Sequence, residues 1–151
     1  MNENLKRVSD KIIYFHRAKY EESISPMKLQ KLCYYAQGFS IALMGEALFD
    51  NDFEAWQHGP VITELYHEYK KFGWKQIDTD IDESVINNNP NENELLQEIV
   101  GHFGSYDGST LSVMTHKESP WRNARGDLND AEASKNLISK ESISEYFKQQ
   151  V

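Results

Sequence analysis

The chain has 151 residues and a formal net charge of −8, and its composition is 39% hydrophobic and 26% charged. This balance is typical of a globular protein and excludes a disordered or membrane-embedded one, so we expect a single domain over residues 1–151. No apolar run reaches the about 18 residues that a bilayer span needs, and the stretch "MNENLKRVSDK" lacks the apolar segment of a signal peptide. We therefore expect a cytoplasmic protein whose acidic charge favours a basic partner and disfavours nucleic acid and membranes.

Cys33 is the one cysteine of the chain, which excludes an internal disulfide and any zinc site built from several cysteines. It falls inside an apolar pattern with helical spacing. We therefore expect a small buried side chain and not a nucleophile.

The first two predicted elements are helices, because their apolar residues recur every three or four positions. The first contains Leu5, Val8, Ile12 and Phe15. The second contains Leu29, Leu32, Ala36, Phe39 and Leu43. Ser25 and Pro26 suit the start of this second helix and Gly45 suits its end, so we expect it to form the centre of the fold.

A short hairpin, or a pair of extended segments, is predicted after the second helix. The stretch "EALFDNDFEAW" contains two short apolar pieces separated by the polar residues 50–52. A third helix is then expected from Pro60 through Phe72, ending at Gly73. This interpretation treats Gly59 and Pro60 as a tight turn that leads into a helix.

The second half of the chain predicts three more helices separated by polar loops. One contains Leu95, Ile99 and Phe103 and ends at Gly104, one is capped by Ser109, and one carries a capping box of Ser142 and Glu145. The polar stretches 75–93 and 126–140 are expected to be surface loops. All four prolines, Pro26, Pro60, Pro90 and Pro120, lie where a helix could begin. The fold class is therefore mainly α, with about six helices and a small β hairpin between the second and the third.

The sequence contains catalytic and metal-binding patterns only in incomplete form. Glu64 and His67 have the Glu-x-x-His spacing of a di-metal helix, but no second pair of this kind occurs. The segment "GFSIA" lacks the last glycine of a nucleophile elbow. We expect no metal, no cofactor and no catalytic residue, although His58 and His116 remain an acid–base pair in principle.

Two similar constructions stand out, "AWQHGPVITELY" and "THKESPWRNAR". Each places a tryptophan near a proline, with a histidine just before that proline. In one interpretation both indoles fill the core and bond backbone carbonyls. In the other, aromatic side chains beside arginine belong to a protein interface, and the charged neighbours of Trp121 favour a partly exposed position. The candidate partner-binding residues are Trp56, His58, His116, Trp121 and Arg122.

At these residues the sequence resembles the SocA-like or Panacea-domain family of bacterial and prophage antitoxins. The similarity spans about residues 24–147. Its parts are specific in combination: the run "KLQKL" followed by "YYAQ", the run "EAW" with the Gly-Pro pair and "ELY", and the pair "TH" with the later "PW".

This resemblance implies a mostly helical, non-enzymatic domain that neutralises a protein toxin encoded by an adjacent gene, by direct binding. It also implies a second possibility, since one branch of the family delivers the toxin to a ClpXP-type protease as an adaptor. Because many members are phage-associated, a third possibility is a phage-encoded protein that binds a host factor. The resemblance names neither the toxin nor the oligomeric state.

Overall fold

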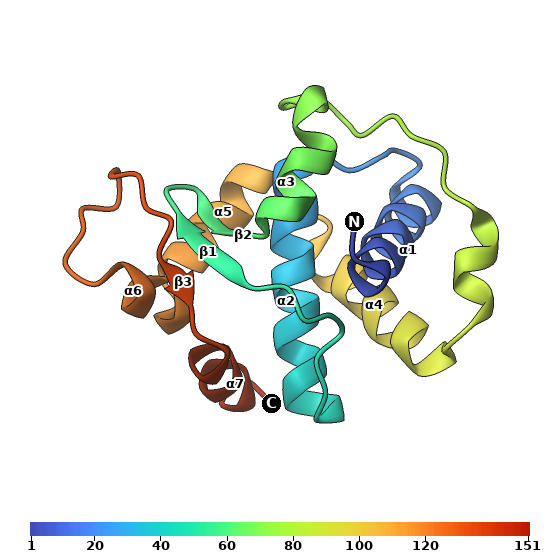
Figure 1. Ribbon diagram of the computed structural model, residues 1–151. Helices are drawn as coiled ribbons and strands as arrows, with labels where there is room; N and C mark the ends of the chain where they lie inside the picture. Colours follow the sequence, from blue (N-terminus) through green and yellow to red (C-terminus); the bar gives the residue numbers. More distant parts are fainter.

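The computed structural model describes residues 1–151 and consists mainly of helices, as predicted (Figure 1). The α-helices are α1 (Glu3–Tyr20), α2 (Pro26–Met44), α3 (Thr63–Tyr69), α4 (Pro90–Phe103), α5 (Gly108–His116), α6 (Ser119–Arg125) and α7 (Lys140–Lys148). The strands are β1 (Phe53–Trp56), β2 (Gly59–Val61) and β3 (Leu137–Ile138), and two 3₁₀ helices, η1 (Lys70–Phe72) and η2 (Glu83–Asn87), complete the elements. None of the helices combines the length and the apolar composition that crossing a membrane requires.

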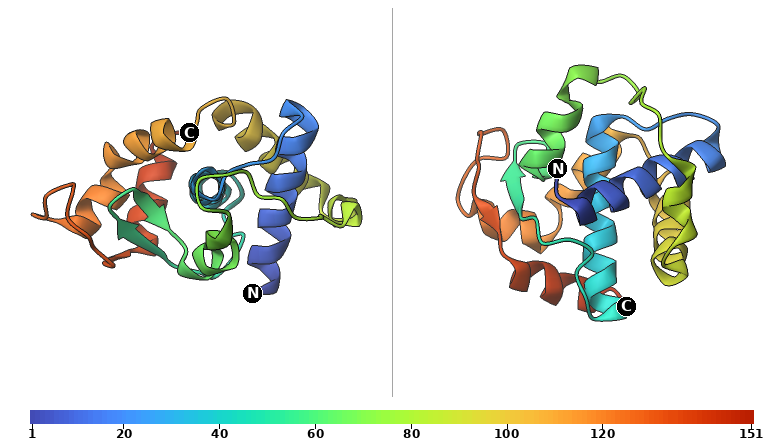
Figure 2. Two further views of the ribbon diagram at one scale, coloured as in Figure 1. Left: turned by 90° about the horizontal axis from the view of Figure 1, so that it is seen from above. Right: turned by 45° about the vertical axis from the view of Figure 1, so that its right-hand side comes forward.

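Helix α2 lies at the centre of the molecule, and the view along its axis in Figure 2 shows the other elements arranged around it. The side chain of Ser25 accepts a hydrogen bond from the backbone N–H of Lys28, and Pro26 occupies the first turn. Gly45 ends the helix in the left-handed conformation, at a φ of 73°. Both predicted ends of the central helix are therefore confirmed.

The hydrophobic core is one cluster that includes residues from α1, α2, α4, α6 and α7. Helix α2 packs against α1, α3, α4, α5, α7 and β2. Cys33 is among the fully buried residues of this core, as expected, and burial raises the pKa of its thiol. Gly38 lies directly against the ring of Phe147, which allows α7 to pack closely on α2.

Buried polar side chains of α2 hold distant parts of the chain. The side-chain amide of Gln37 accepts a hydrogen bond from the backbone N–H of Leu48 and donates one to the backbone carbonyl of Phe49, both at 2.8 Å. The hydroxyls of Tyr34 and Tyr35 donate to the carboxylate of Glu118 at 3.0 and 2.7 Å. The runs "KLQKL" and "YYAQ" therefore supply polar contacts as well as core packing.

The three strands form an antiparallel sheet in the order β2–β1–β3. Trp56 pairs with Gly59, so the hairpin turns at residues 57–58 and not at 50–52 as predicted. Pro60 lies within β2 and the helix begins at Thr63, so the predicted helix start at Pro60 was wrong. Because β2 is an edge strand, the missing N–H of the proline is tolerated there. Strand β3 falls in the predicted loop 126–140, and its two residues are too few to produce a periodic signal.

Among the remaining helices, two have the predicted prolines in their first turns and two begin slightly before the predicted caps. Pro90 and Pro120 lie in the first turns of α4 and α6, as predicted. Asp107 caps α5 in place of Ser109, and Ser139 caps α7 in place of Ser142. Both helices therefore begin before the predicted caps.

Candidate functional site

The β1–β2 hairpin is fixed by hydrogen bonds from side chains of α2, α5 and α6 to its backbone carbonyls. They run from Arg125 to Ala55 (2.9 Å), from Trp121 to Trp56 (2.8 Å), from Ser112 to His58 (2.6 Å), from Lys31 to Pro60 (3.1 Å) and from Gln30 to Ile62 (3.0 Å). Gln30 also accepts from the backbone N–H of Ile62, at 2.9 Å. Since buried backbone carbonyls need partners, these bonds fix the hairpin without using its outward-facing side chains.

Trp121 supports the hairpin from the core side and is fully buried, with 0% of its surface exposed. Its indole lies between α6 and β1, stacks on the imidazole of His116 at a centroid distance of 4.0 Å, and has the Arg125 guanidinium 4.7 Å from its ring centre. The expectation of a partly exposed Trp121 was wrong, because the charged residues that follow it include Arg122, which points to solvent, and Arg125, which points inward.

His116 and Arg122 lie beside this buried indole. His116 is half-buried, its Nε2 has no hydrogen-bond partner, and burial lowers its pKa while the backbone of Gln57 partly offsets that effect. Arg122 is exposed and donates to the backbone carbonyl of His116 at 2.9 Å, with Asp130 at 3.4 Å. The structure thus brings the two tryptophan-containing segments into contact, with the buried Trp121 bonded to the backbone of Trp56 in the hairpin.

Trp56 and His58 belong to the outer side of the hairpin. The indole of Trp56 is half-buried, donates to Glu54 Oε1 at 2.8 Å and packs edge-on against Tyr66 of α3, with a centroid distance of 5.0 Å. The His58 side chain is exposed. Of the five residues predicted for partner binding, His58 and Arg122 are exposed, Trp56 and His116 are half-buried, and Trp121 is buried.

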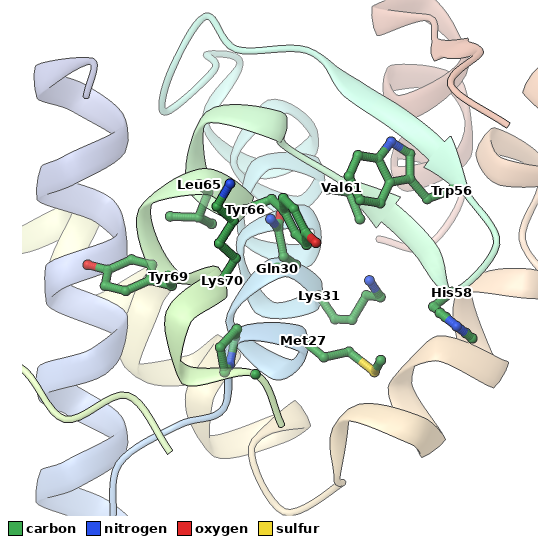
Figure 3. Close-up of a pocket in the computed structure, with 12 residues that line it drawn as sticks. Met27, Gln30, Lys31, Trp56, His58, Val61, Leu65, Tyr66, Tyr69 and Lys70 are labelled. Atoms are coloured by element: carbon green, nitrogen blue, oxygen red, sulfur yellow. The ribbon is translucent and has the colours of Figure 1, made fainter. Parts of the chain in front are cut away.

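A cavity of about 220 Å³ lies between α2, the hairpin and α3 (Figure 3). A second cavity of about 400 Å³ is lined by the hairpin and by residues 133–135. Both are lined by Trp56, His58 and Val61, and we call the two together the hairpin groove. The first cavity is smaller than the about 300–1,000 Å³ of a typical small-molecule site and suits a single side chain.

Lys31 lines the inner end of the groove and is only 1% exposed. Its side chain extends from α2 toward the hairpin (Figure 3), and its ammonium donates its one hydrogen bond to the Pro60 carbonyl. None of the salt bridges of the protein includes it. Burial lowers its pKa to about 7 because an isolated charge is costly away from water.

Gly59 allows the hairpin to close over this lysine. Its φ of 112° is unfavourable for residues with a side chain, and an added Cβ would lie 2.7 Å from Cε of Lys31 and 2.7 Å from Oγ1 of Thr115. The Gly-Pro pair of the sequence therefore serves the hairpin and its lysine, and not a helix start.

Three residues of this region were not among the predicted site residues. Lys31 belongs to the run "KLQKL" but lies between the positions of the apolar stripe, so helical spacing gives no signal for its burial. Tyr66 is 41% exposed. Trp74 is 86% exposed and directly follows Gly73, which lines the groove. A tryptophan within a polar stretch could have indicated an exposed aromatic residue.

The structure brings together no group of three or more His, Cys, Asp or Glu residues that could hold a metal ion. Glu64 Oε1 instead accepts a hydrogen bond from the backbone N–H of Asn2 at 2.7 Å. His67 lies on the exposed side of α3 with its Nδ1 3.4 Å from Nζ of Lys70. The Glu-x-x-His pair is therefore part of the surface of this helix.

A comparison with protein families gives one assignment, which covers the hairpin and most of the residues around it. The model of the family described as "Antitoxin SocA-like, Panacea domain" matches residues 29–122, more than half of the chain. No curated protein and no solved structure matches. The matched range runs from α2 through the hairpin to the buried Trp121 and Arg122. The chain therefore belongs to the SocA-like antitoxin family with a Panacea domain.

Proposed function

We propose that this chain is a cytoplasmic antitoxin that neutralises a protein toxin encoded by an adjacent bacterial or prophage gene, by binding it directly and without catalysis. The observation that supports this proposal most is the family match over residues 29–122, because it includes the hairpin and four of the five residues whose side chains bond its backbone carbonyls. We also propose that residues 1–151 act as one domain, since a single core includes residues from α1 to α7.

The hairpin groove is the proposed contact surface for the toxin. Trp56 and Tyr66 form an aromatic pair at its rim, and His58 is exposed beside them. Trp74, which is 86% exposed and follows Gly73 of the groove lining, is the fourth side chain assigned to this surface. Aromatic side chains on a rigid support are typical of the residues that dominate binding energy, and a specific interface of about 800 Å² per partner would extend beyond the groove. Arg122 lies at the edge of the proposed contact surface. Trp121 and His116 support the hairpin from the core side and hold it in position.

Growth of cells that express the neighbouring reading frame from an inducible promoter tests the proposal. We expect growth to stop when the neighbour is expressed alone and to return when this chain is supplied from a second plasmid. The two proteins should also co-purify. A neighbour that is harmless alone, or that stays toxic in the presence of this chain, contradicts the proposed function.

Matched variants then test the contact surface. Trp56→Ala and Trp74→Ala should each weaken toxin binding at least tenfold while the protein stays folded. Leu43→Ala is the control, since Leu43 is 58% exposed and lies about 18 Å along α2 from Lys31. Unchanged binding by both tryptophan variants would remove the groove from the interface. A toxin that is degraded faster when the antitoxin is present would favour the protease-adaptor form of the same function.

A further inference from the structure

The local charge of the hairpin groove is opposite to the charge of the whole protein. The chain has 24 acidic and 16 basic residues. The residues that line the two cavities nevertheless include Lys31, Lys70, Lys135 and His58, and no Asp or Glu. The carboxylate of Glu54 accepts a hydrogen bond from the indole N–H of Trp56 at the rim of the groove. The groove is thus a basic recess in an acidic protein.

Lys31 has unused hydrogen-bonding capacity at the inner end of this recess. An ammonium group has three donors, and this one has a single hydrogen bond within the protein, to the Pro60 carbonyl. Buried ammonium groups are ordinarily paired with a carboxylate. Lys31 is 1% exposed and lacks such a partner, so an anionic group entering the cavity would meet both a charge and free donors.

The walls of the cavity restrict what can carry that anionic group. Beside the lysine they are formed by apolar and aromatic side chains, among them Met27, Val61, Leu65 and Tyr66. The volume of about 220 Å³ accommodates one side chain. The three lysines of the groove are few for a polyanion such as nucleic acid, which the net charge of −8 would also repel.

We propose that the hairpin groove binds an acidic segment of the partner protein, with one Asp or Glu carboxylate on the ammonium of Lys31 and a neighbouring apolar side chain against Trp56 and Tyr66. This inference rests on the proposed function, in which the partner is the toxin. It adds the chemistry of the toxin segment that is recognised. The whole-protein charge favours a basic partner, but the contact itself takes an acidic one.

Binding should be coupled to proton uptake. A carboxylate next to Lys31 favours the protonated amine, so binding raises the pKa of this lysine above its value of about 7 in the free protein. The affinity then falls as the pH rises above 7, by up to about tenfold per pH unit, because the free protein must first take up a proton.

A pair of blocked pentapeptides, EFEFE and its uncharged match QFQFQ, tests the chemistry on the full chain. We expect EFEFE to shift the NMR signals of the Trp56 indole and the Lys31 ammonium and QFQFQ to bind at least tenfold more weakly. Lys31→Met keeps the length of the side chain and should remove the preference for EFEFE. The matched control is Lys148→Met, an exposed lysine of α7, which should bind as the wild type does.

Three outcomes would overturn the inference. They are a wild-type chain that does not distinguish the two peptides, a Lys31→Met variant that still does, and a five-nucleotide single-stranded DNA that binds in the groove more tightly than EFEFE. Co-expression with the toxin separates this inference from the proposed function. If the wild type fails to protect, the proposed function fails. If the wild type and a folded Lys31→Met variant protect equally well, only the inference fails.

Discussion

The indole nitrogen of Trp121 donates a hydrogen bond of 2.8 Å to the backbone carbonyl of Trp56, so the two tryptophans of the candidate site act at different depths. Trp121 is buried and fixes the hairpin, while the Trp56 side chain lies at the groove. A loss of function has a different cause at each position.

Substitutions at these two tryptophans should therefore separate folding from binding. Trp121→Ala removes a fully buried side chain and should lower the free energy of unfolding by about 3–5 kcal/mol. Trp121→Phe should cost about 1–3 kcal/mol, since it leaves the Trp56 carbonyl without its partner. Trp56→Ala should cost about 1 kcal/mol and still weaken toxin binding. Urea unfolding and calorimetric binding measure the two effects, and a Trp121→Ala protein as stable as the wild type would contradict the structure.

Lys31→Met should be more stable than the wild type, and the difference should depend on pH. Below pH 7 Lys31 is protonated in both the folded and the unfolded chain, and its buried charge costs on the order of 3–5 kcal/mol. The folded-state pKa is lowered from 10.5 to about 7, so between these values the unfolded chain binds more protons and the wild type gains stability as the pH rises. The advantage of the variant should therefore be largest at pH 6 and small near pH 10.

Urea unfolding of both proteins at pH 6, 8 and 9.5 measures this difference. Groups that titrate in both proteins cancel in the comparison, which isolates the lysine. An advantage that stays constant across this range would show that Lys31 has the pKa of an exposed lysine.

Replacement of Glu118 by glutamine should be tolerated, whereas replacement by alanine should destabilise the protein. Burial raises the pKa of this carboxyl, and the hydroxyls of Tyr35 and Tyr34 lower it by less. Glu118→Gln should change the free energy of unfolding by about 1 kcal/mol or less, whereas Glu118→Ala leaves two buried hydroxyls unpaired and should cost about 2–4 kcal/mol.

The pH dependence of Glu118→Gln provides a second check. Between pH 4.5 and the raised pKa of the folded state, a larger fraction of Glu118 is protonated in the folded chain than in the unfolded chain. The stability of the wild type relative to Glu118→Gln should therefore fall as the pH rises through this window. A rise would mean that the tyrosine hydroxyls outweigh burial.

Gly38→Ala should destabilise the protein, although alanine favours helices by about 1 kcal/mol. The added methyl group would overlap the ring of Phe147, and overpacking of this kind typically costs about 1–3 kcal/mol. Phe147→Leu should relieve the overlap, so the double variant should be more stable than the sum of the two single effects. A thermal-denaturation double-mutant cycle measures the coupling, and additive effects would place α7 farther from α2.

The sequence predicted the elements whose signals are local. Ser25, Pro26 and Gly45 mark the ends of α2 because capping depends on neighbouring residues alone. The hairpin turn was misplaced because its strands are defined by pairing, including the contact of Glu54 with Leu137 from a distant part of the chain. A glycine and a proline in succession indicate a turn equally well before a helix or inside a hairpin.

The candidate site was predicted only in part. Trp56 and His58 were identified from their motif and do line the groove. The burial of Trp121 depends on how α6 packs behind β1, which charged neighbours in the sequence cannot show. The position of Lys31 at the end of a cavity requires the hairpin and α3 to be in place. Its role was therefore beyond what helical spacing could predict.

The hairpin is anchored through its carbonyl oxygens, which every amino acid possesses. Its conformation therefore depends mainly on the hydrogen bonds to these oxygens, and less on the side chains of Trp56 and His58 or of Lys135 in the adjoining loop. A library randomised at these positions, with the anchoring residues Gln30, Lys31, Ser112, Trp121 and Arg125 kept, should consist largely of folded proteins with altered recognition. The domain is in this sense a scaffold on which new partner specificities could be selected.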